Sequence, residues 1–322
     1  MNTLNPKGSK PFKIYILDAF HPSGVELAKS FAQVVAWPDP RVNDWPEEAD
    51  AVMVRMTSIT KEQLARAKQV KIICKQGVGL DTIDLSAAQA HGIVVSRTPG
   101  VNSEAVAEMA LALSLTVSRR TSRFDRLLRA GVPIVRPDHL GLEMLGKTVG
   151  VVGMGNIGTR LAKKWHAAFD AQILAYDPFA PASAWSDLPH ERVTHLKEML
   201  PRVDLLSLHL PLTQESHHMI GLEELKMMKA QAILINVSRG GLIDEEALYT
   251  VMKEGHLFGA GLDVFEHAEP PHKEHPLLSL DNVVPTPHAA GGTVETQIRS
   301  SMQVAQQVID VLSGKPAAHA AF

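Results

Sequence analysis

A glycine-rich segment near the middle of the chain is the first feature that suggests chemistry. A β-branched run, Thr148–Val152, leads into Gly-x-Gly-x-x-Gly, and apolar residues then recur at helical spacing. The six positions of the turn are Gly153, Met154, Gly155, Asn156, Ile157 and Gly158. In such a unit the first glycine permits the tight turn, the second lets the backbone approach a pyrophosphate, and the third lets helix and strand pack closely. The N–H groups that open the helix favour phosphates, so we expect a dinucleotide site.

An acidic residue follows at the position that selects between dinucleotides. The next predicted strand, Gln172–Tyr176, ends at Asp177, about 20 residues beyond the last glycine of the turn. A carboxylate there accepts hydrogen bonds from the ribose hydroxyls and repels a 2′-phosphate. We therefore predict that the cofactor is NAD rather than NADP.

The elements that must hold this turn belong to the second of two strand–helix series. Strand candidates of the second series are Thr148–Val152, Gln172–Tyr176, Asp204–Leu208, Ala232–Asn236, Gly259–Asp263 and Asn282–Val284. The first series has the strand candidates Ile14–Leu17, Ala51–Val54, Lys71–Cys74 and Ile93–Val95, with helical patterns at Gly24–Phe31 and Lys61–Ala67. Short β-branched runs that alternate with amphipathic stretches predict parallel sheets covered by helices.

Two junctions join the series. A long helical pattern begins after Asn102 or Ser103, and a last helix, Val294–Leu312, is expected to return to the first series. We predict an α/β fold of two doubly wound parallel-sheet domains. A Rossmann cofactor domain, residues 102–290, is inserted in a flavodoxin-like substrate domain, residues 1–101 and 291–322. The basic segment Arg119–Arg129 does not fit the alternation of strands and helices, and we interpret it as an excursion from the domain and a candidate dimer arm.

Composition narrows the class of protein. The chain has 322 residues, 45% hydrophobic and 21% charged, with a formal net charge of -3. This is ordinary for a globular protein of two domains, and the lack of a basic stripe argues against nucleic acid as a partner. The single cysteine, Cys74, lies in an apolar run and indicates a buried thiol in a reducing compartment. The polar start of the chain and the absence of long apolar runs predict a cytoplasmic protein outside membranes.

Further motifs occur in order along most of the chain. They are Gly77–Asp84, Thr98–Asn102, Leu208–Thr213, Asn236–Gly241, Gly261–Phe265, Glu269–Pro270 and Thr286–His288. With the glycine turn, they resemble the D-isomer-specific 2-hydroxyacid dehydrogenase family from about residue 50 to 312. The resemblance is to its phosphoglycerate dehydrogenase and hydroxypyruvate reductase-like members, in a short form that we expect to have no regulatory domain.

The resemblance implies an enzyme that transfers a hydride between NAD(H) and a small, D-configured 2-hydroxy acid or its 2-oxo form, in the cleft of a homodimer's subunit. The family's catalytic residues correspond to Arg239, Glu269 and His288. An arginine offers a planar fork of donors to the substrate carboxylate and carbonyl. A histidine exchanges a proton near neutral pH, and a neighbouring glutamate favours its protonated form and orients the ring.

The resemblance also implies binding residues. The N–H groups of Val78 and Gly79 would bind the substrate carboxylate in a glycine-flanked turn, and Asn102 would lie near substrate at the domain junction. The remaining implied cofactor contacts are His209, Pro211 and Thr213 on the adenosine side, and Val237 and Asp263 on the nicotinamide side. Asp263 would hold the carboxamide.

The sequence departs from the family pattern at a few positions. An apparent insertion at His267-Ala268 lengthens the segment before Glu269, which leaves Glu266 as a rival partner for His288. His217-His218 and the pair His272 and His275 are spaced like metal ligands, but without a cysteine or carboxylate cluster we expect exposed loop histidines and no metal. The roles of Arg97, Met109 and Pro285 stay unassigned.

One arginine bears on the choice of substrate. Arg55 directly follows the strand candidate Ala51–Val54, and ligands bind beyond the carboxyl ends of strands in such sheets. With Thr57 and Ser58 nearby, an arginine fork suits a second anionic or polar group, as in hydroxypyruvate, phosphohydroxypyruvate or, as a minimal case, glyoxylate. The alternative is a surface ion pair with Glu62 or Asp50.

Two other functions share this pattern. An NAD-sensing corepressor of the same fold keeps the cofactor site and the three catalytic positions, so motifs alone do not separate it from a dehydrogenase. Formate-oxidising relatives resemble the rest but carry Gln in place of the glutamate, and Glu269 argues against them.

Overall fold

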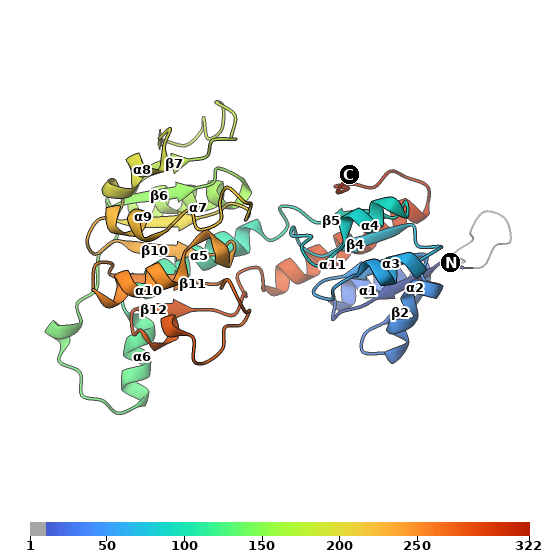
Figure 1. The fold of residues 1–322 in the computed structure, drawn as a ribbon, viewed down its shortest axis with the longest axis horizontal. Coiled ribbons are helices and arrows are strands. Elements are labelled where there is room, and N and C mark those ends of the chain that lie inside the picture. Colours follow the sequence, from blue (N-terminus) through green and yellow to red (C-terminus); the bar gives the residue numbers. More distant parts are fainter. Residues whose placement is uncertain (1–10) are drawn as a thin grey trace. The chain divides into compact units, whose positions relative to one another are not determined.

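The computed structural model describes residues 11–322, so the predicted polar start of the chain lies outside the described residues. The chain divides into two compact units (Figure 1), one built by the chain up to Asn102 together with Gly292–Phe322, the other by Ser103–Gly291. Both are α/β, and both sheets are entirely parallel, which confirms the predicted fold class.

The first unit has a five-stranded sheet in the order β2-β1-β3-β4-β5, the flavodoxin-like order. Its strands are β1 Lys13–Ile16, β2 Gln33–Ala36, β3 Ala51–Val54, β4 Ile72–Lys75 and β5 Val94–Arg97. Its helices are α1 Pro22–Lys29, α2 Trp45–Glu48, α3 Lys61–Arg66, α4 Leu85–Ala90 and α11 Val294–Leu312. Alternate residues of β1 face different apolar clusters, Ile14 and Ile16 on one side and Tyr15 on the other, so helices cover both faces.

The last helix, α11, packs against α1 in the first unit, as predicted. At the crossing, a Cβ added to Gly24 of α1 would lie 2.5 Å from the carbonyl oxygen of Ser301. Only a glycine allows the two helices to approach this closely.

The second unit has a seven-stranded sheet in the order β12-β11-β10-β9-β6-β7-β8, which contains the Rossmann order with one further edge strand. Its strands are β6 Thr148–Val152, β7 Gln172–Tyr176, β8 Glu191–Arg192, β9 Leu205–Leu208, β10 Ile233–Asn236, β11 Gly259–Leu262 and β12 Val283–Pro285. Its helices are α5 Ser103–Ser118, α6 Thr121–Arg129, α7 Asn156–Phe169, α8 Leu196–Met199, α9 Leu222–Met227 and α10 Glu245–Lys253.

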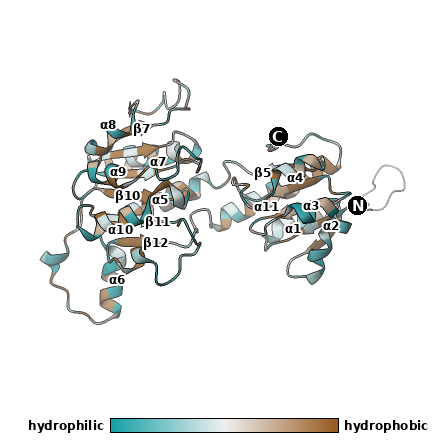
Figure 2. Ribbon diagram, viewed as in Figure 1, coloured by the Kyte–Doolittle hydropathy of each residue, from teal (hydrophilic) through white to brown (hydrophobic). Residues whose placement is uncertain are grey.

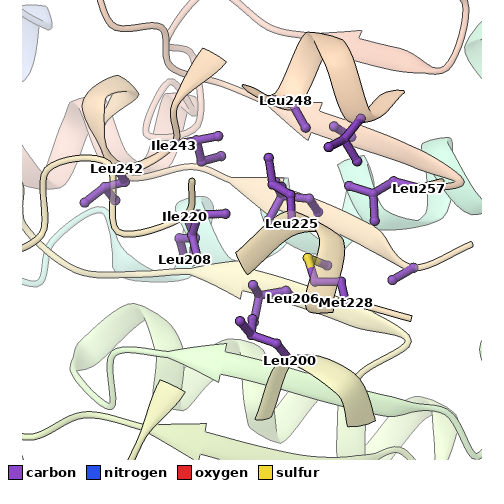
Figure 3. Packing of buried hydrophobic residues seen from close by; sticks show 14 of the residues in the cluster. Leu200, Leu206, Leu208, Ile220, Leu225, Met228, Leu242, Ile243, Leu248 and Leu257 are labelled. Atoms are coloured by element: carbon purple, nitrogen blue, oxygen red, sulfur yellow. The ribbon is translucent and has the colours of Figure 1, made fainter. Parts of the chain in front are cut away.

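Two apolar clusters fill the faces of this sheet, and hydrophobic colour follows the strands in Figure 2. In Figure 3, Leu225 of α9 and Leu248 of α10 belong to the same apolar cluster as the strand residues Leu206 and Leu208. The predicted start of α10 is confirmed, because the Asp244 carboxylate accepts hydrogen bonds from the N–H groups of Glu246 and Ala247. The clusters hold the strand ends, and the loops beyond them carry the candidate site.

Two strands were not predicted. β2 and β8 are the edge strands at one side of each sheet, and both contain half-exposed or exposed residues. An edge strand of two to four residues with little burial lacks the continuous apolar run by which the other strands were recognised.

Candidate active site

The glycine turn between β6 and α7 has the geometry that its sequence predicts. Gly153 adopts φ +100°, and a Cβ there would lie 2.3 Å from the carbonyl oxygen of His209. A Cβ at Gly158 would lie 2.0 Å from the carbonyl oxygen of Gly153, whereas a Cβ at Gly155 would meet nothing within 4 Å. Fold contacts therefore require the outer two glycines, while the exposed middle glycine keeps open space that a phosphate group fits. Asn156 and Ile157 open α7, and N–H groups at the start of a helix have no partner within the helix.

Asp177 follows β7 as predicted, and its carboxylate is also part of the turn. Its Oδ2 accepts a hydrogen bond from the N–H of Met154 at 2.8 Å, and its Oδ1 accepts from the N–H groups of Phe179 and Ala180 at 2.9 and 3.1 Å. These contacts bind the end of β7 to the glycine turn. The side chain remains half-exposed beside it, so ribose hydroxyls would share an already hydrogen-bonded carboxylate.

The segment after β9 lies beside the glycine turn. The His209 ring binds the Ser207 hydroxyl through Nε2 at 2.8 Å, and burial lowers the pKa of His209 to about 3. The imidazole is therefore neutral, and its buried Nδ1 has no hydrogen-bond partner in the described chain. Pro211 and Thr213 are exposed and are held by Ser216, whose hydroxyl donates to the Pro211 carbonyl and accepts from the Thr213 N–H.

Arg239 lies in a turn fixed on several sides after β10. The Asn236 side chain donates to the Arg239 carbonyl at 2.7 Å, and the Ser238 hydroxyl donates to the Leu208 carbonyl at 2.7 Å. Val237, between them, is buried. A Cβ at Gly240 would lie 2.1 Å from the Phe265 carbonyl carbon, so this turn packs directly on the segment that leads to Glu269.

Glu269 and His288 form a pair. His288 Nδ1 is hydrogen-bonded to Glu269 Oε2, and Glu269 Oε1 accepts from the Phe265 N–H at 3.3 Å. The hydrogen bond that His288 donates to Glu269 raises the pKa of His288, an effect that burial and the Arg239 charge partly oppose. Burial raises the pKa of Glu269, but the hydrogen bond and charge of His288 outweigh it and the net shift is downward. The structure thus brings the three residues together, with a carboxylate and a protonated imidazole favoured.

Asp263, which was predicted to hold the nicotinamide carboxamide, makes several hydrogen bonds within the chain. The carboxylate is completely buried and accepts from the Thr286 hydroxyl at 2.6 Å and from the N–H groups of Ala289 and Ala290 at 2.8 and 2.9 Å. The N–H of His288 donates to the Asp263 carbonyl at 2.8 Å, and His288 adopts φ 52°. Asp263 therefore holds the loop in which His288 takes a conformation that L-residues rarely adopt.

The rival glutamate is engaged elsewhere. Glu266 Oε1 binds His217 Nε2 at 3.0 Å and Oε2 binds His218 Nε2 at 2.9 Å. Nearby, Glu245 Oε2 binds His275 Nε2 at 3.0 Å. His217 lies exposed in a loop as predicted, whereas His218 and His275 are partly buried, and all three pair with a carboxylate that is distant in sequence. The sequence showed no such cluster because Glu266 lies in another loop and Glu245 is the first residue of α10.

The first unit holds its own predicted residues at the carboxyl edge of its sheet. Val78 is 40% exposed, and neither its N–H nor that of Gly79 donates to another described residue. Gly77 before them adopts φ +122°. Asn102, half-buried, precedes α5. These features leave two adjacent N–H groups open to an anion.

Arg55 lies in a loop that is held by Asp18 and Lys75. Asp18 Oδ2 accepts from the Arg55 N–H at 2.5 Å, and Lys75 donates to the Arg55 carbonyl. Neither predicted ion pair forms, since Asp50 Oδ2 accepts from the Lys13 N–H and Glu62 pairs with Lys61. The pairing register aligns Val54 with Lys75 and Lys75 with Arg97, so three cationic residues follow or end neighbouring strands.

Two further predictions concern the environment of the chain. Cys74 is completely buried, and burial raises the pKa of its thiol to about 12, in agreement with a core residue. Within residues 11–322, no helix combines the length and the apolar character needed to cross a membrane.

Comparison with known proteins agrees with this geometry. Residues 111–290 match the family model of the D-isomer specific 2-hydroxyacid dehydrogenase NAD-binding domain. The chain is 38% identical over 307 residues to D-3-phosphoglycerate dehydrogenase of Methanocaldococcus jannaschii, covering 94% of this chain but only 58% of that protein. It is 42% identical over 268 residues to hydroxypyruvate reductase of Thermotoga maritima, covering 82% of this chain and 85% of that one.

A solved structure extends the match to the whole architecture. A Thermus thermophilus protein superposes with a TM-score of 0.87 and 34% identity, over 97% of this chain and 100% of that one. The matched domain contains the glycine turn, Arg239, Glu269 and His288. The chain therefore belongs to the D-isomer-specific 2-hydroxyacid dehydrogenase family, and its second unit carries the NAD-binding domain.

Proposed function

We propose that this protein is an NAD-dependent D-2-hydroxyacid dehydrogenase that acts on a small 2-hydroxy or 2-oxo acid. The observation that carries the proposal is the Glu269–His288 pair in the field of Arg239. NAD(H), when bound, accepts or supplies the hydride. His288 binds Glu269 through Nδ1, so its Nε2 is the atom that gives a proton to the carbonyl oxygen in reduction and takes one from the hydroxyl in oxidation.

Other residues of the chain are proposed to bind and orient the substrate and the cofactor. Arg239 offers its guanidinium to the substrate carboxylate and carbonyl oxygen. The open N–H groups of Val78 and Gly79 suit the carboxylate, and Asn102 is a further substrate contact by family resemblance. The glycine turn and Asp177 bind the pyrophosphate and ribose, with His209, Pro211 and Thr213 on the adenosine side and Val237 and Asp263 on the nicotinamide side.

The substrate domain favours an acid with a second anionic or strongly polar group. Arg55 makes no ion pair within residues 11–322. Arg97 lies close to the open N–H groups of Val78 and Gly79, since its Nη1 donates to the Val78 carbonyl at 3.4 Å. Arginine forks bind phosphate and carboxylate bidentately. Hydroxypyruvate, phosphohydroxypyruvate and glyoxylate are the proposed candidates, and the names of the relatives include hydroxypyruvate reductase and phosphoglycerate dehydrogenase.

A panel of 2-oxo acids tests the reaction and the substrate class together. NADH oxidation is measured with glyoxylate, pyruvate, hydroxypyruvate, phosphohydroxypyruvate, 2-oxoisocaproate and phenylpyruvate. Arg55→Ala should lower kcat/KM selectively for the anionic and hydroxylated acids, whereas Arg41→Ala, an exposed arginine paired with Asp39, should not. Turnover of none of the acids would favour a corepressor-like NAD-binding protein. A preference for phenylpyruvate would refute the proposed role of Arg55.

Cofactor choice has a separate test. Asp177→Asn keeps one acceptor oxygen but removes the charge that repels a 2′-phosphate, so the ratio of kcat/KM for NADH to that for NADPH should fall. A wild-type protein that uses NADPH equally well would contradict the assignment. We also propose that the protein is a cytoplasmic homodimer.

A further inference from the structure

A compact group of metal-ligating side chains lies outside the residues assigned to the reaction. In the part of the chain that the structure describes, one group of three such residues brings its ligand atoms within 4.8 Å of one another, His217, His218 and Glu266. The two rings are stacked, with centroids 3.9 Å apart and planes inclined by 22°. Both Nε2 atoms point at the same carboxylate, at 3.0 and 2.9 Å.

Backbone hydrogen bonds hold the segments that carry these three side chains. The N–H of His218 donates to the Gly241 carbonyl at 2.7 Å, and that of His217 donates to the Thr213 carbonyl at 3.0 Å. The N–H of Glu266 donates to Glu245 Oε1 at 2.9 Å. His218 adopts φ 50°, in the region that non-glycine residues seldom occupy. Two of the three hydrogen bonds join segments that are distant in sequence, so local chain preference alone does not produce this arrangement.

We propose that His217, His218 and Glu266 bind a divalent first-row transition cation, such as Zn²⁺. Nitrogen–oxygen separations of 3.0 and 2.9 Å are those of neighbouring ligands at nearly right angles around an ion with bonds of about 2.0–2.2 Å. Two imidazoles with one carboxylate suit Zn²⁺, Ni²⁺, Co²⁺ or Cu²⁺, whereas Ca²⁺ and Mg²⁺ prefer oxygen ligands. The ion takes the place of the protons that now join each ring to the carboxylate.

The site is accessible and is completed by solvent. Side-chain exposure is 48% for His217, 37% for His218 and 18% for Glu266. Three protein ligands leave at least one position of the ion for water. Glu245 accepts a hydrogen bond from the N–H of Glu266 and thereby fixes the backbone from which this ligand extends.

The cation would restrict the movement of the loops that carry Arg239 and Glu269. Gly241, which accepts from His218, follows Arg239 by two positions, and Gly240 packs on the backbone of Phe265 and Glu266. Glu269 lies three residues beyond Glu266. An ion that joins His217 and His218 to Glu266 therefore limits the movement of both loops. This consequence for activity rests on the proposed function, whereas the binding site itself does not.

The test measures binding to the full-length protein, treated with chelator and without substrate or NADH. With one equivalent of Cu²⁺, the electron paramagnetic resonance spectrum of the wild type should show coupling to two nitrogens, and that of His218→Ala or His217→Ala to one. In competition with a chromophoric chelator, Glu266→Gln should bind Zn²⁺ more than about tenfold more weakly. His195→Ala, which removes an exposed histidine elsewhere in the same unit, should match the wild type.

The outcomes are decisive in either direction. Loss of tight binding in the three variants with retention in His195→Ala supports the site. Equal binding by wild type and all variants shows adventitious surface histidines and overturns it, as does a wild-type spectrum without two-nitrogen coupling, which needs no variant to fold. Because no turnover is measured, these results stand apart from any failure of the 2-oxo acid panel.

Discussion

The two ring nitrogens of His288 differ in their surroundings, because Nδ1 is bound to Glu269 and Nε2 is the atom proposed to face the substrate. The His288 side chain is 43% exposed although Nδ1 is bound to Glu269. The other nitrogen is thus available to a carbonyl oxygen, and the carboxylate at the far side keeps the ring protonated at higher pH.

Removal of the ring should abolish proton transfer and spare the cofactor. We expect His288→Ala to lower kcat for reduction about 10²–10⁴-fold, the usual contribution of a placed acid or base. NADH affinity, measured by fluorescence titration, should be unchanged, because among residues 11–322 no hydrogen bond or ion pair joins His288 to the glycine turn. Loss of less than tenfold in kcat would assign the proton to another group.

The glutamate should set the pH range of reduction. Reduction needs protonated His288, so its rate falls as pH rises through the pKa of the histidine. Glu269 raises that pKa, and Glu269→Gln should therefore move the falling limb of kcat/KM to lower pH. Glu266→Gln should leave the limb in place, because Glu266 binds His217 and His218. The reverse result would show that the insertion at residues 267–268 had been aligned incorrectly.

At the scale of elements, Gly153 and Gly158 of the glycine turn are required by backbone contacts, whereas Gly155 is free of them and is left for the ligand. A Cβ at Gly155 meets no protein atom within 4 Å. Gly155→Ala should therefore keep the wild-type Tm but lower the affinity for NADH more than about tenfold, because the methyl group occupies the approach of the pyrophosphate. Calorimetry without and with NADH measures both. Unchanged NADH affinity would place the phosphates elsewhere.

Neighbouring glycines after Arg239 provide a matched pair. Gly240→Ala puts a Cβ 2.1–2.3 Å from the backbone of Phe265 and Glu266, whereas the nearest atoms to a Cβ at Gly241 are side-chain carbons at 3.3 Å. Overpacking typically costs about 1–3 kcal/mol. Gly240→Ala should thus lower stability in urea and reduce kcat by displacing Arg239 from Glu269, and Gly241→Ala should do much less. Equal effects would show that the contact does not position the pair.

At the scale of the whole molecule, one segment of the second unit exposes an unusual number of apolar side chains. They are Leu128, Val132, Val135, Leu140 and Leu145, between 44% and 71% exposed. They belong to α6 and the chain after it, which extends from the sheet in Figure 1. Arg123 and Arg126 fix α6 to Asp281 before β12. Exposed apolar patches of this kind mark interaction surfaces.

We expect this surface to join two copies of the chain. Wild type should elute as a dimer in size exclusion with light scattering, and Leu128→Glu with Leu140→Glu should produce a monomer. Leu222→Glu, at an exposed leucine of α9, should remain dimeric. A monomeric wild type at micromolar concentration would show that the segment has another partner.

Residue types and their spacing were enough to predict the α/β architecture and to name the residues of the candidate site. Strands β3 and β4 are buried on both faces, and strands of this kind are recognised by continuous apolar runs. The glycine spacing identifies the turn before α7, because each of the three glycines has different steric surroundings. Edge strands β2 and β8 were missed, since their half-exposed residues carry no such pattern.

The hydrogen-bond partners of groups that are distant in sequence depend on tertiary packing and could not be predicted from residue spacing. Glu266 and Glu269 lie three residues apart in the loop after β11, and either could have been the partner of His288. In the structure Glu269 pairs with His288, whereas Glu266 pairs with His217 and His218. Asp263 uses its buried carboxylate to hold the loop of His288. Hydrogen bonds act over about 3 Å in space, so residue types and spacing along the chain define the candidates, while the packing of strand-end loops determines which of them meet.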